Sequence, residues 1–352
     1  MNRPKKFLFL YSELAGYMLS CMKKLAESKG AEIFIIRWPL NKEAPFQFDF
    51  PSDMHVHQKD EFSFEALKNY VRKIDPDVIY CSGWMDKQYI KICKEYRSRI
   101  PVITAFDNKW TGSFKQHIAQ VVSPFTLQKY FSHCFVPGPQ QYSYGLKLGF
   151  KKENILTGLY AADIDFFYHQ YQKNKAVKQR DFPKRFIYVG RYYSFKGIED
   201  LWQAFIELQQ EQANEWELWC FGTGDLAPVI HPKIKHFGFV QLQEQANFIA
   251  QTGVFVLPSR FEPWAVVVHE YAAAGFPLLL SNEVGAASTF LKEGKNGFVF
   301  KSGDVNDMKR VMKLMMQLSD HEQNKMADLS AELAQEITPQ KWADTIYSVL
   351  EK

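Results

Sequence analysis

Short runs of apolar residues alternate with amphipathic segments along the chain, which is the pattern of strand–helix–strand units around a parallel sheet. In the first half of the chain, the apolar runs that predict buried strands cover residues 6–11, 32–38, 77–81, 101–106 and 133–137. In the second half, the corresponding runs cover residues 185–190, 217–222, 234–240, 254–259, 277–281 and 297–300. The alternation therefore predicts the α/β class, with a parallel sheet in each half.

The segments between these runs show the spacing of amphipathic helices. Residues 14–29 repeat apolar side chains on one helical face, and Gly30 follows them as a C-terminal stop signal. Residues 198–210 show the same periodicity. The last predicted helix begins with Thr338 as its N-cap and Pro339 as its first helical residue.

The chain of 352 residues is too long for one ordinary hydrophobic core and fits two α/β domains. We expect the first domain to cover residues 1–157 and the second to cover residues 184–337. The segment between them, residues 158–183, is polar and charged, and we interpret it as a linker. Residues 338–352 form the last predicted helix.

The charge balance is mildly basic, with a formal net charge of +4 and a pI near 8.6. This balance favours anionic ligands such as phosphates, but it falls short of the concentrated basic face that binds nucleic acid. We therefore expect no nucleic-acid partner. The five cysteines are scattered without metal-ligand spacing, which indicates free thiols in a reducing compartment.

The apolar run near the N-terminus, residues 7–11, is ended by Ser12 and Glu13, so it is too short for a signal peptide and is better interpreted as a first strand. No apolar stretch approaches the length that is needed to cross a bilayer. We expect a cytoplasmic protein that is at most peripheral to the inner face of the membrane.

The segment RFEPWAVVVHEYAAAGFP, residues 260–277, carries the strongest indication of chemistry. It follows a predicted strand and places Glu262 and Glu270 eight positions apart. At a loop-to-helix junction, two such carboxylates can bind hydroxyls of one extended ligand, while the helix N-terminus offers free N–H groups to an anion. From the spacing alone, two unrelated glutamates are an equally good interpretation.

A second segment, FIYVGRYYSFKGIEDLWQAF at residues 186–205, places Arg191 and Lys196 between the carboxyl end of a strand and a helix. Open α/β sheets bind ligands at this place. The planar fork of an arginine and the point charge of a lysine together suit a diphosphate. Taken in isolation, the pair would be interpreted as two surface cations.

Together these segments resemble the retaining glycosyltransferases of family 4, which have the GT-B fold. The Glu-x7-Glu spacing, the Pro258-Ser259 that precedes it and the Gly-Arg…Lys-Gly pattern all match. The resemblance implies two Rossmann-like domains that face each other across a cleft, with the last helix crossing back onto the first domain. It implies a metal-independent hexosyltransferase that moves a sugar, with retention, from a nucleoside diphosphate sugar to an acceptor hydroxyl in surface polysaccharide or glycolipid synthesis.

The resemblance also assigns roles to single residues. Arg191 and Lys196 would hold the diphosphate and stabilise the charge on it as it departs, while Glu262 would bind the donor sugar and Glu270 the ribose hydroxyls. Asp107 is the remaining candidate catalytic residue. The other candidate donor-binding residues are Gly190, Gly222, Phe239, Val240, Pro263, Trp264, Ala265 and Val266. The candidate residues on the acceptor side are Gly16 and Asp107.

The chain departs from the family pattern at three places. The loop after the first strand has one glycine, Gly16, where the family has a Gly-Gly pair. Asp107 stands where many members carry a histidine, and a carboxylate accepts a hydrogen bond from a sugar hydroxyl but cannot act as a neutral donor. Residues 285–289 read Gly-Ala-Ala-Ser-Thr where the family has Gly-Gly-x-x-Glu. These departures concern sugar and acceptor recognition more than the diphosphate.

One further motif, Asp163-Ile164-Asp165, has the Asp-x-Asp form that binds metal in the other large glycosyltransferase fold. Its position after LTGLYAA matches the interdomain segment of GT-B proteins, which favours a structural role. We therefore expect neither a metal nor an organic cofactor.

Two questions stay open at the level of the sequence. Residues 106–131 mix aromatic residues with lysines, which suits contact with anionic lipid or a lipid-linked acceptor, although a packed helix beside a loop is the simpler interpretation. The expected partners are a nucleotide-sugar donor and a saccharide or lipid-linked acceptor. The alternative functions are a sugar-nucleotide epimerase and a non-catalytic nucleotide-sugar binding protein.

Overall fold

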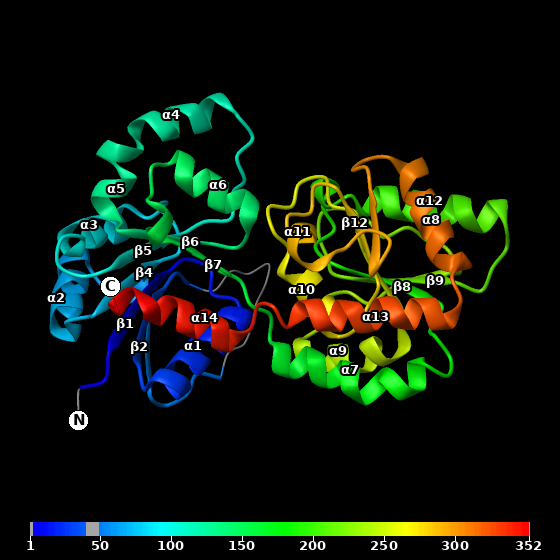
Figure 1. Ribbon diagram of the computed structural model, residues 1–352, viewed down its shortest axis with the longest axis horizontal. Helices are drawn as coiled ribbons and strands as arrows, with labels where there is room; N and C mark the ends of the chain where they lie inside the picture. The colour runs from blue at the N-terminus through cyan, green and yellow to red at the C-terminus, as the bar shows by residue number, and fades with distance from the viewer. Residues whose placement is uncertain (1–2, 40–48, 352) are drawn as a thin grey trace. The chain divides into compact units, whose positions relative to one another are not determined.

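The computed structural model describes residues 3–39 and 49–351, and the chain divides into two compact units. Unit 1 comprises Met1–Asp163 together with Ile337–Lys352, and unit 2 comprises Ile164–Glu336. Each unit is a parallel sheet with helices on both faces (Figure 1). The predicted α/β class with two parallel sheets is therefore confirmed.

The sheet of unit 1 has seven strands in the order β3-β2-β1-β4-β5-β6-β7. The strands are β1 Lys6–Tyr11, β2 Glu32–Arg37, β3 Met54–Gln58, β4 Val78–Cys81, β5 Val102–Ala105, β6 His133–Val136 and β7 Ile155–Thr157. The apolar runs predicted five of them. The two edge strands, β3 and β7, were missed because β3 reads MHVHQ and β7 has only three residues, so neither forms an apolar run.

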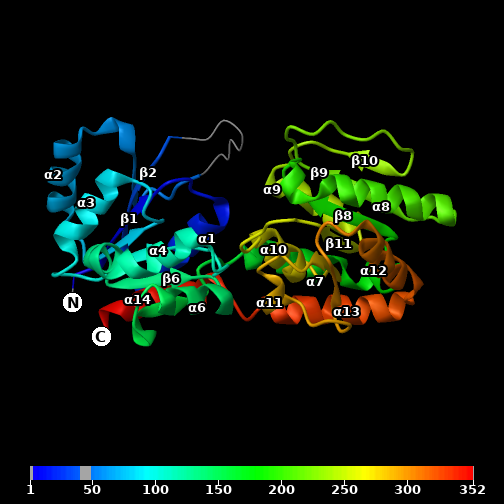
Figure 2. The ribbon, with the colours of Figure 1, turned by 90° about the horizontal axis from the view of Figure 1, so that it is seen from above.

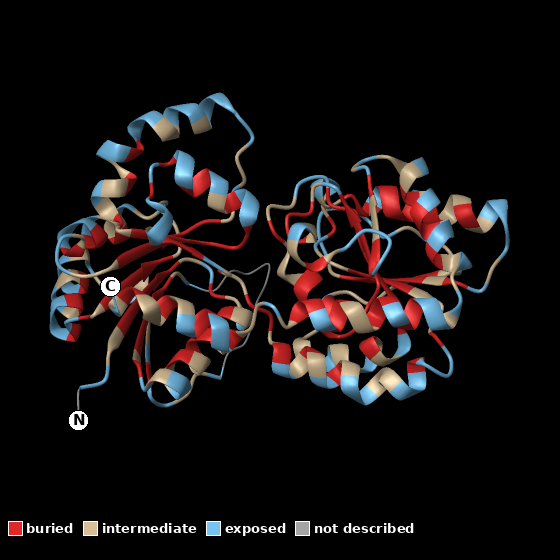
Figure 3. Ribbon diagram, viewed as in Figure 1, coloured by how far each residue is buried: buried red, intermediate tan, exposed pale blue. Residues whose placement is uncertain are grey.

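Alternate residues of β1 point into two separate cores, as the period of a strand requires. Phe7, Phe9 and Tyr11 pack with helix α1, Gly16–Lys29, and helix α14, Pro339–Tyr347. Leu8 and Leu10 pack in the core on the other face. The helices on that other face are α2 Phe64–Ile74, α3 Lys87–Tyr96, α5 Leu127–Tyr130 and α6 Pro139–Lys147. In the burial view, the strands are mostly red, whereas the helices beside them alternate red with tan and pale blue along their length (Figure 3).

The capping signals behave as the sequence predicts. Helix α1 ends at Gly30, which takes a left-handed conformation with φ 60°. Helix α14 begins at Pro339, and the side chain of its N-cap Thr338 accepts a hydrogen bond from the backbone N–H of Lys341. The indole of Trp342 is buried in unit 1 and donates to the backbone carbonyl of Leu159 at 3.0 Å.

The sheet of unit 2 has six strands in the order β10-β9-β8-β11-β12-β13. The strands are β8 Arg185–Val189, β9 Glu217–Phe221, β10 Ile234–His236, β11 Val254–Leu257, β12 Leu278–Ser281 and β13 Gly297–Phe300. The helices are α7 Ile164–Lys178, α8 Ile198–Glu211, α9 Leu242–Gln251, α10 Val266–Ala273, α11 Ala287–Phe290, α12 Val305–Gln317 and α13 Asp320–Ala334. Helices α8 and α12 pack together, and α7, α10 and α13 pack together on the other side of the sheet, as Figure 2 shows from above.

The predicted linker is corrected by the structure. Residues 164–178 of the segment 158–183 form helix α7, which belongs to unit 2. The side chains of Ile164 and Phe167 are buried, and Phe167 contacts the ring of Tyr271 on α10. The polar sequence is explained by the exposed remainder of this helix, so the boundary between the units falls at residue 163.

Candidate functional site

The candidate site of unit 2 lies where the strand order of the sheet reverses, between β8 and β11. The chain leaves β8 toward β9 on one side, whereas β11 pairs with β12 on the other, so their carboxyl ends lie at the switch point of the sheet, where open α/β sheets bind ligands. The loop after β8 leads into α8, and the loop after β11 leads into α10. The sequence-predicted residues of the donor site lie on these loops, on the neighbouring loops and in the first two turns of α10.

The ion pair between Lys196 and Glu262 connects the two loops. Lys196 ends the short helical turn η4, Ser194–Lys196, and Glu262 lies between β11 and α10. The two side chains are only 17% and 11% exposed, and the hydroxyl of Ser259 also donates to the Glu262 carboxylate, at 3.2 Å. The structure therefore joins two residues that are 66 positions apart in the sequence.

Three further contacts hold the same two loops together. The guanidinium of Arg260 donates two hydrogen bonds, at 2.7 and 2.9 Å, to the carboxylate of Asp200 on α8. The backbone N–H of Arg260 donates to the carbonyl of Phe195 at 2.8 Å. Gly197 has φ 68°, and a Cβ at this position would lie 2.2 Å from the carbonyl oxygen of Pro258. Glycine is therefore required for the close approach of the two loops.

Glycines also bring together the loops that follow β8, β9 and β10. Gly222 has φ 129°, and a Cβ on it would lie 1.9 Å from the carbonyl oxygen of Gly190. Its backbone N–H donates to the carbonyl of Gly238 at 2.7 Å. The segment after β10 is thereby held beside the site, with the side chain of Phe239 exposed and that of Val240 half-buried.

Arg191 lies two residues after the end of β8 and is exposed. Its guanidinium lies 5.3 Å from the ring centre of Tyr193, and its backbone carbonyl accepts a hydrogen bond from the buried phenol of Tyr188 at 2.9 Å. Burial raises the pKa of Tyr188 well above its ordinary value, so this phenol stays protonated and continues to donate. The hydrogen bond from the Tyr188 phenol thus holds the backbone of Arg191 in place, while the Arg191 side chain is exposed to solvent.

The segment between the two glutamates is held by the loop after β12. The backbone N–H of Gly285 donates to the carbonyl of Glu262 at 3.0 Å, and that of Ala286 donates to the carbonyl of Trp264 at 2.9 Å. A Cβ on Gly285 would lie 1.9 Å from the carbonyl oxygen of Pro263. Residues 285–289 differ from the family pattern but keep Gly285, and this backbone pairing requires a glycine at that position.

Helix α10 starts at Val266, so Glu262 precedes the helix and Glu270 is half-buried in its second turn, as the spacing predicts. The N-cap Ala265 has φ 78° and ψ 87°, a conformation that costs a residue with a Cβ about 1–3 kcal/mol. Such strain is typical of functional loops, and nothing in the sequence beyond a small residue at the junction indicates it. The side chain of Ala265 does not cap the helix.

His269 lies next to Glu270 in the sequence but on the buried side of α10. Its Nε2–H donates to the carbonyl of Ala334 on α13 at 2.8 Å, and its ring stacks on Phe290 with 4.3 Å between the centres. Burial lowers the pKa of His269 to about 4, so the imidazole is neutral near pH 7. This histidine, which sequence reasoning missed, anchors the helix that carries Glu270.

The candidate acceptor-side residues lie in unit 1. Asp107 follows β5, its carboxylate accepts a hydrogen bond from the phenol of Tyr160 at 3.4 Å, and its backbone carbonyl accepts one from the side-chain amide of Gln141 at 3.0 Å. Burial, with the charge of Asp107 as a further cause, raises the pKa of Tyr160 well above its ordinary value. Gly16 is the first residue of α1, and a Cβ there would meet nothing within 4 Å.

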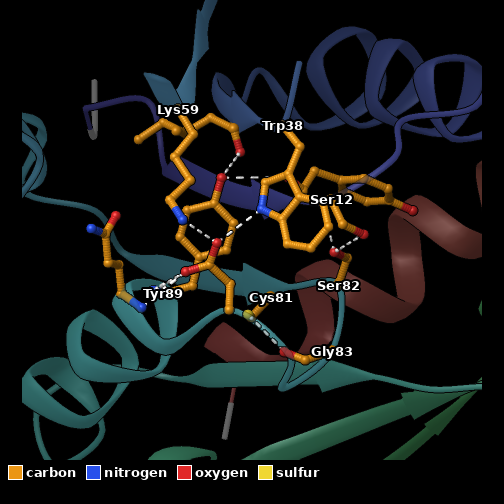
Figure 4. Close-up of polar contacts among 11 residues, drawn as sticks. Ser12, Trp38, Lys59, Cys81, Ser82, Gly83 and Tyr89 are labelled. Atoms are coloured by element: carbon orange, nitrogen blue, oxygen red, sulfur yellow. Dashed lines mark hydrogen bonds and ion pairs between the residues drawn. The ribbon is translucent and has the colours of Figure 1, made fainter. Parts of the chain in front are cut away.

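A polar cluster fills the carboxyl edge of β1, β2 and β4 in unit 1 (Figure 4). The indole of Trp38, at 2.9 Å, and the ammonium of Lys59 both donate to one oxygen of Asp86, whose other oxygen caps α3. Burial alone would raise the pKa of Asp86, but the hydrogen bonds from Lys59 and Trp38 outweigh it and the pKa lies below its ordinary value. Ser12 and Ser82 are joined through their hydroxyls at 3.1 Å. The polar side chains of this cluster therefore bind one another.

Asp163 and Asp165 fall at the boundary between the units, Asp163 at the end of unit 1 and Asp165 in the first turn of α7. Within residues 3–39 and 49–351, no three His, Cys, Asp or Glu side chains gather as they would around a metal ion. Over the same residues, no helix combines the length and the apolar character that a bilayer-spanning helix needs.

Comparison with known proteins shows what the segment that carries this site is similar to. Residues 183–317 match the family of glycosyl transferases group 1, a range that contains both loops and both glutamates. Among curated proteins, a lipopolysaccharide 1,6-galactosyltransferase of Salmonella typhimurium is 23% identical over 258 residues, which is 68% of this chain and 66% of the relative. For the first curated relatives that match, the chain spans between a third and two thirds of their length.

Solved structures of similar architecture define the fold. A sucrose-phosphate synthase from Thermosynechococcus elongatus matches with a TM-score of 0.76 at 15% identity, over 99% of this chain and 98% of that one. The Anabaena protein HepE, crystallised with UDP-glucose, matches with a TM-score of 0.70 at 13% identity, over 98% and 99% of the two chains. The fold is that of the GT-B glycosyltransferases.

Proposed function

We propose that this protein is a metal-independent, retaining glycosyltransferase that moves a hexose from a nucleoside diphosphate sugar to an acceptor hydroxyl. The observation that carries the proposal is the Lys196–Glu262 pair at the reversal of the strand order in unit 2. A cation for the diphosphate and a carboxylate for sugar hydroxyls lie side by side there, within a segment that matches the glycosyltransferase family. The UDP-glucose in the Anabaena structure supports a nucleotide sugar as the donor.

The chemistry assigns each group a task. As the bond between the sugar and the diphosphate breaks, negative charge gathers on the departing phosphate, and positively charged groups that are already in place stabilise it. Lys196 would supply that charge from the η4 turn and Arg191 from the end of β8. The first N–H groups of α10, at Val266 and Val267, add the favourable end of a helix dipole. These groups take the place that a metal ion has in other transferases.

Lys196 is neutralised by Glu262 in this structure, so donor binding would involve an exchange of partners. A diphosphate carries more charge than one carboxylate and would draw the ammonium toward itself. Glu262 would then be available to accept hydrogen bonds from the hydroxyls of the sugar, and Glu270 to accept them from the ribose. Asp107 and the α1 terminus with Gly16 are assigned to the acceptor side, as the family resemblance implies.

The cellular role follows from the relatives and is part of the proposal. The Salmonella relative is named for lipopolysaccharide synthesis, which suggests a saccharide or lipid-linked acceptor and a place in surface polysaccharide or glycolipid synthesis. Such acceptors are reached from the cytoplasm at the inner face of the membrane, where we place this protein.

The test is a thermal-shift screen of UDP-, GDP- and other nucleotide sugars, followed by an assay of sugar release from the donor that stabilises the protein. A ligand that binds the native state raises the apparent stability. We expect one donor to stabilise the protein and to be hydrolysed slowly to free sugar, with no effect of a chelator on the rate. Stabilisation without any release of sugar would identify a binding protein instead, and a rate that is abolished by chelator would restore Asp163 and Asp165 as metal ligands.

A further inference from the structure

Helix α4, Phe114–Val122, is unusual because none of its nine residues, all of which the structure describes, is buried. The helix lies at the top of unit 1 in Figure 1 and is mostly coloured as exposed in Figure 3. The following turn η2, Ser123–Phe125, continues it toward α5. An isolated helix of nine residues is only marginally stable in water. The helix therefore needs contacts with the rest of the chain, and the question is which of its sides makes them.

The outward side of this helix is apolar. Phe114 is 78% exposed, Val121 72% and Phe125 70%, and Ile118 and Val122 are also exposed. Their spacing of four, seven, eight and eleven positions from Phe114 places all five on one helical face. We call these five residues the outer face of α4.

The opposite side of the helix attaches to the domain through smaller and polar groups. Ala119 packs against the core of unit 1, and the ring of Trp110 meets that of His117 at 4.9 Å. After the helix, the hydroxyl of Ser123 in η2 and the side-chain amide of Gln128 in α5 both donate to the backbone carbonyl of Leu148. The helix is therefore oriented with its large apolar side chains toward solvent, the reverse of an ordinary surface helix.

The chain segment that contains the outer face carries charge of one sign, and Lys129 lies 6.0 Å from the ring centre of Phe125. The sequence from residue 108 to residue 152 contains no Asp, Glu or Arg. It contains six lysines, namely Lys109, Lys115, Lys129, Lys147, Lys151 and Lys152. This stretch alone carries a charge of +6, whereas the whole chain carries +4. An apolar helical face flanked by lysines is the composition of helices that lie in the interface of a membrane with anionic lipids.

We propose that the outer face of α4 is a docking surface for a bilayer that contains anionic lipids. The side chains of Phe114, Val121 and Phe125 enter the boundary between headgroups and acyl chains, and the lysines contact the lipid phosphates. A second copy of this chain fits less well, because a symmetric contact would bring the two lysine-rich stretches together. The surface lies wholly within unit 1 and does not depend on the donor chemistry proposed above.

The first experiment is cosedimentation of the full chain with vesicles of phosphatidylcholine, with and without phosphatidylglycerol. We expect binding only to the vesicles with phosphatidylglycerol, and weaker binding as salt screens the charges. Phe114→Ser combined with Phe125→Ser should weaken binding at least about tenfold, because two large apolar side chains are no longer withdrawn from water. Ile230→Ser, at a side chain of unit 2 that is 99% exposed, is the matched control and should bind as the unchanged protein does.

The charge is tested separately. Lys115→Glu combined with Lys129→Glu should also weaken binding at least about tenfold, since each lysine near an anionic surface contributes roughly fivefold. Lys325→Glu on α13 makes a single charge reversal elsewhere and should have a far smaller effect. Binding of either double variant at the level of the unchanged protein, or no binding of the unchanged protein to anionic vesicles, would overturn the proposal.

Insertion can be observed directly because all five native cysteines are buried. A Val121→Cys variant carries one exposed thiol, and an environment-sensitive dye on it should shift to the blue when anionic vesicles are added. If the emission of the dye stays that of a water-exposed dye after anionic vesicles are added, insertion is contradicted. If the protein is a dimer without lipid, and the Phe114→Ser, Phe125→Ser variant is a monomer, a second copy covers the face and the membrane proposal is wrong. Melting curves and donor hydrolysis in solution, both expected to be unchanged, show that the variants stay folded.

Discussion

The two units share one architecture but use the carboxyl edges of their sheets differently. In unit 2, the edge presents charged groups in loops that glycines bring together, with Arg191 exposed and Lys196 facing Glu262. In unit 1, the charged groups of the edge are occupied with one another, as the contacts of Lys59 and Trp38 with Asp86 show. In our proposal, the edge of unit 2 binds an anion, whereas the edge around β1, β2 and β4 of unit 1 is held together by its own side chains.

The comparison also concerns how tightly the loops approach. Gly197, Gly222 and Gly285 each lie so close to a neighbouring carbonyl that a Cβ would overlap it. Gly16, at the equivalent edge of unit 1, has open space around it. Close backbone-to-backbone contacts therefore support the edge of unit 2 in addition to its ion pairs, whereas Gly16 in unit 1 makes no such close approach. The following four predictions test this difference, from the largest expected effect to the smallest.

Lys196→Ala should reduce turnover with saturating donor on the order of 100- to 1,000-fold, or about 2.7–4 kcal/mol of transition-state stabilisation. The reason is that Lys196 meets negative charge mainly as it develops on the leaving phosphate, so nucleotide binding should weaken only modestly. Combining this change with Arg191→Ala should cost less than the sum of the single losses, because both cations act on one phosphate.

The measurement for Lys196 is single-turnover and steady-state kinetics beside a melting curve. Lys325→Ala, an exposed lysine of the same unit, is the control and should keep full turnover. Near-normal turnover of a folded Lys196→Ala protein would remove the leaving-group role and make the edge of unit 2 as structural as that of unit 1.

Gly197→Ala should destabilise unit 2 by at least about 2 kcal/mol, since the new Cβ lies 2.2 Å from the carbonyl oxygen of Pro258 and φ is positive. Gly16→Ala in unit 1 should leave stability unchanged or raise it by up to about 1 kcal/mol, because alanine fits the first turn of a helix and restricts the unfolded chain. Urea denaturation of both variants gives the two values. Equal effects in the two units would contradict the difference in loop approach.

Unit 2 should lose stability in mild acid through His269. Its folded pKa is about 4, below the ordinary value of 6.5, so between these values the unfolded chain binds a proton that the folded chain does not. Stability therefore falls as the pH drops from 6.5 toward 4, by about 2 kcal/mol at pH 5 at 1.36 kcal/mol per unit. Above pH 6.5, His269 does not make the free energy of unfolding depend on pH.

The pH dependence is measured by urea denaturation at a series of pH values. His269→Gln, which cannot titrate, should be less stable at pH 7 but should show a flatter decline between pH 6.5 and pH 4. An unchanged slope in this variant would show that other groups cause the acid sensitivity.

Ala265→Gly should stabilise unit 2 by about 1 kcal/mol. Glycine removes the strain of the positive φ at the N-cap of α10, but it also makes the unfolded chain more flexible, which offsets part of the gain. Within residues 3–39 and 49–351, one other non-glycine residue has a positive φ, namely Asp75 of unit 1, with φ 50°. Aspartate tolerates this region better than alanine, so Asp75→Gly should gain less. Melting temperatures of the two variants decide the order, and a larger gain at Asp75 would contradict strain at the site.

Local patterns in the sequence determined most of the fold. Apolar runs predicted five strands of unit 1 and all six of unit 2, and capping residues such as Gly30 and Thr338 marked helix ends. Polar edge strands such as β3 lack an apolar run, because an edge strand has less surface to bury. Helix α7 was mistaken for a linker because its partly exposed surface made its composition polar.

For the site, the sequence by itself specified the chemical types and their spacing, which is why Lys196, Glu262 and Glu270 could be named as candidates. Only the tertiary structure decided that Lys196 and Glu262 form one ion pair, because their proximity depends on β8 and β11 being neighbours in the sheet. It also decided that the apolar face of α4 points outward. Periodicity shows which residues share a face of a helix, but what covers that face depends on packing between segments far apart in the chain.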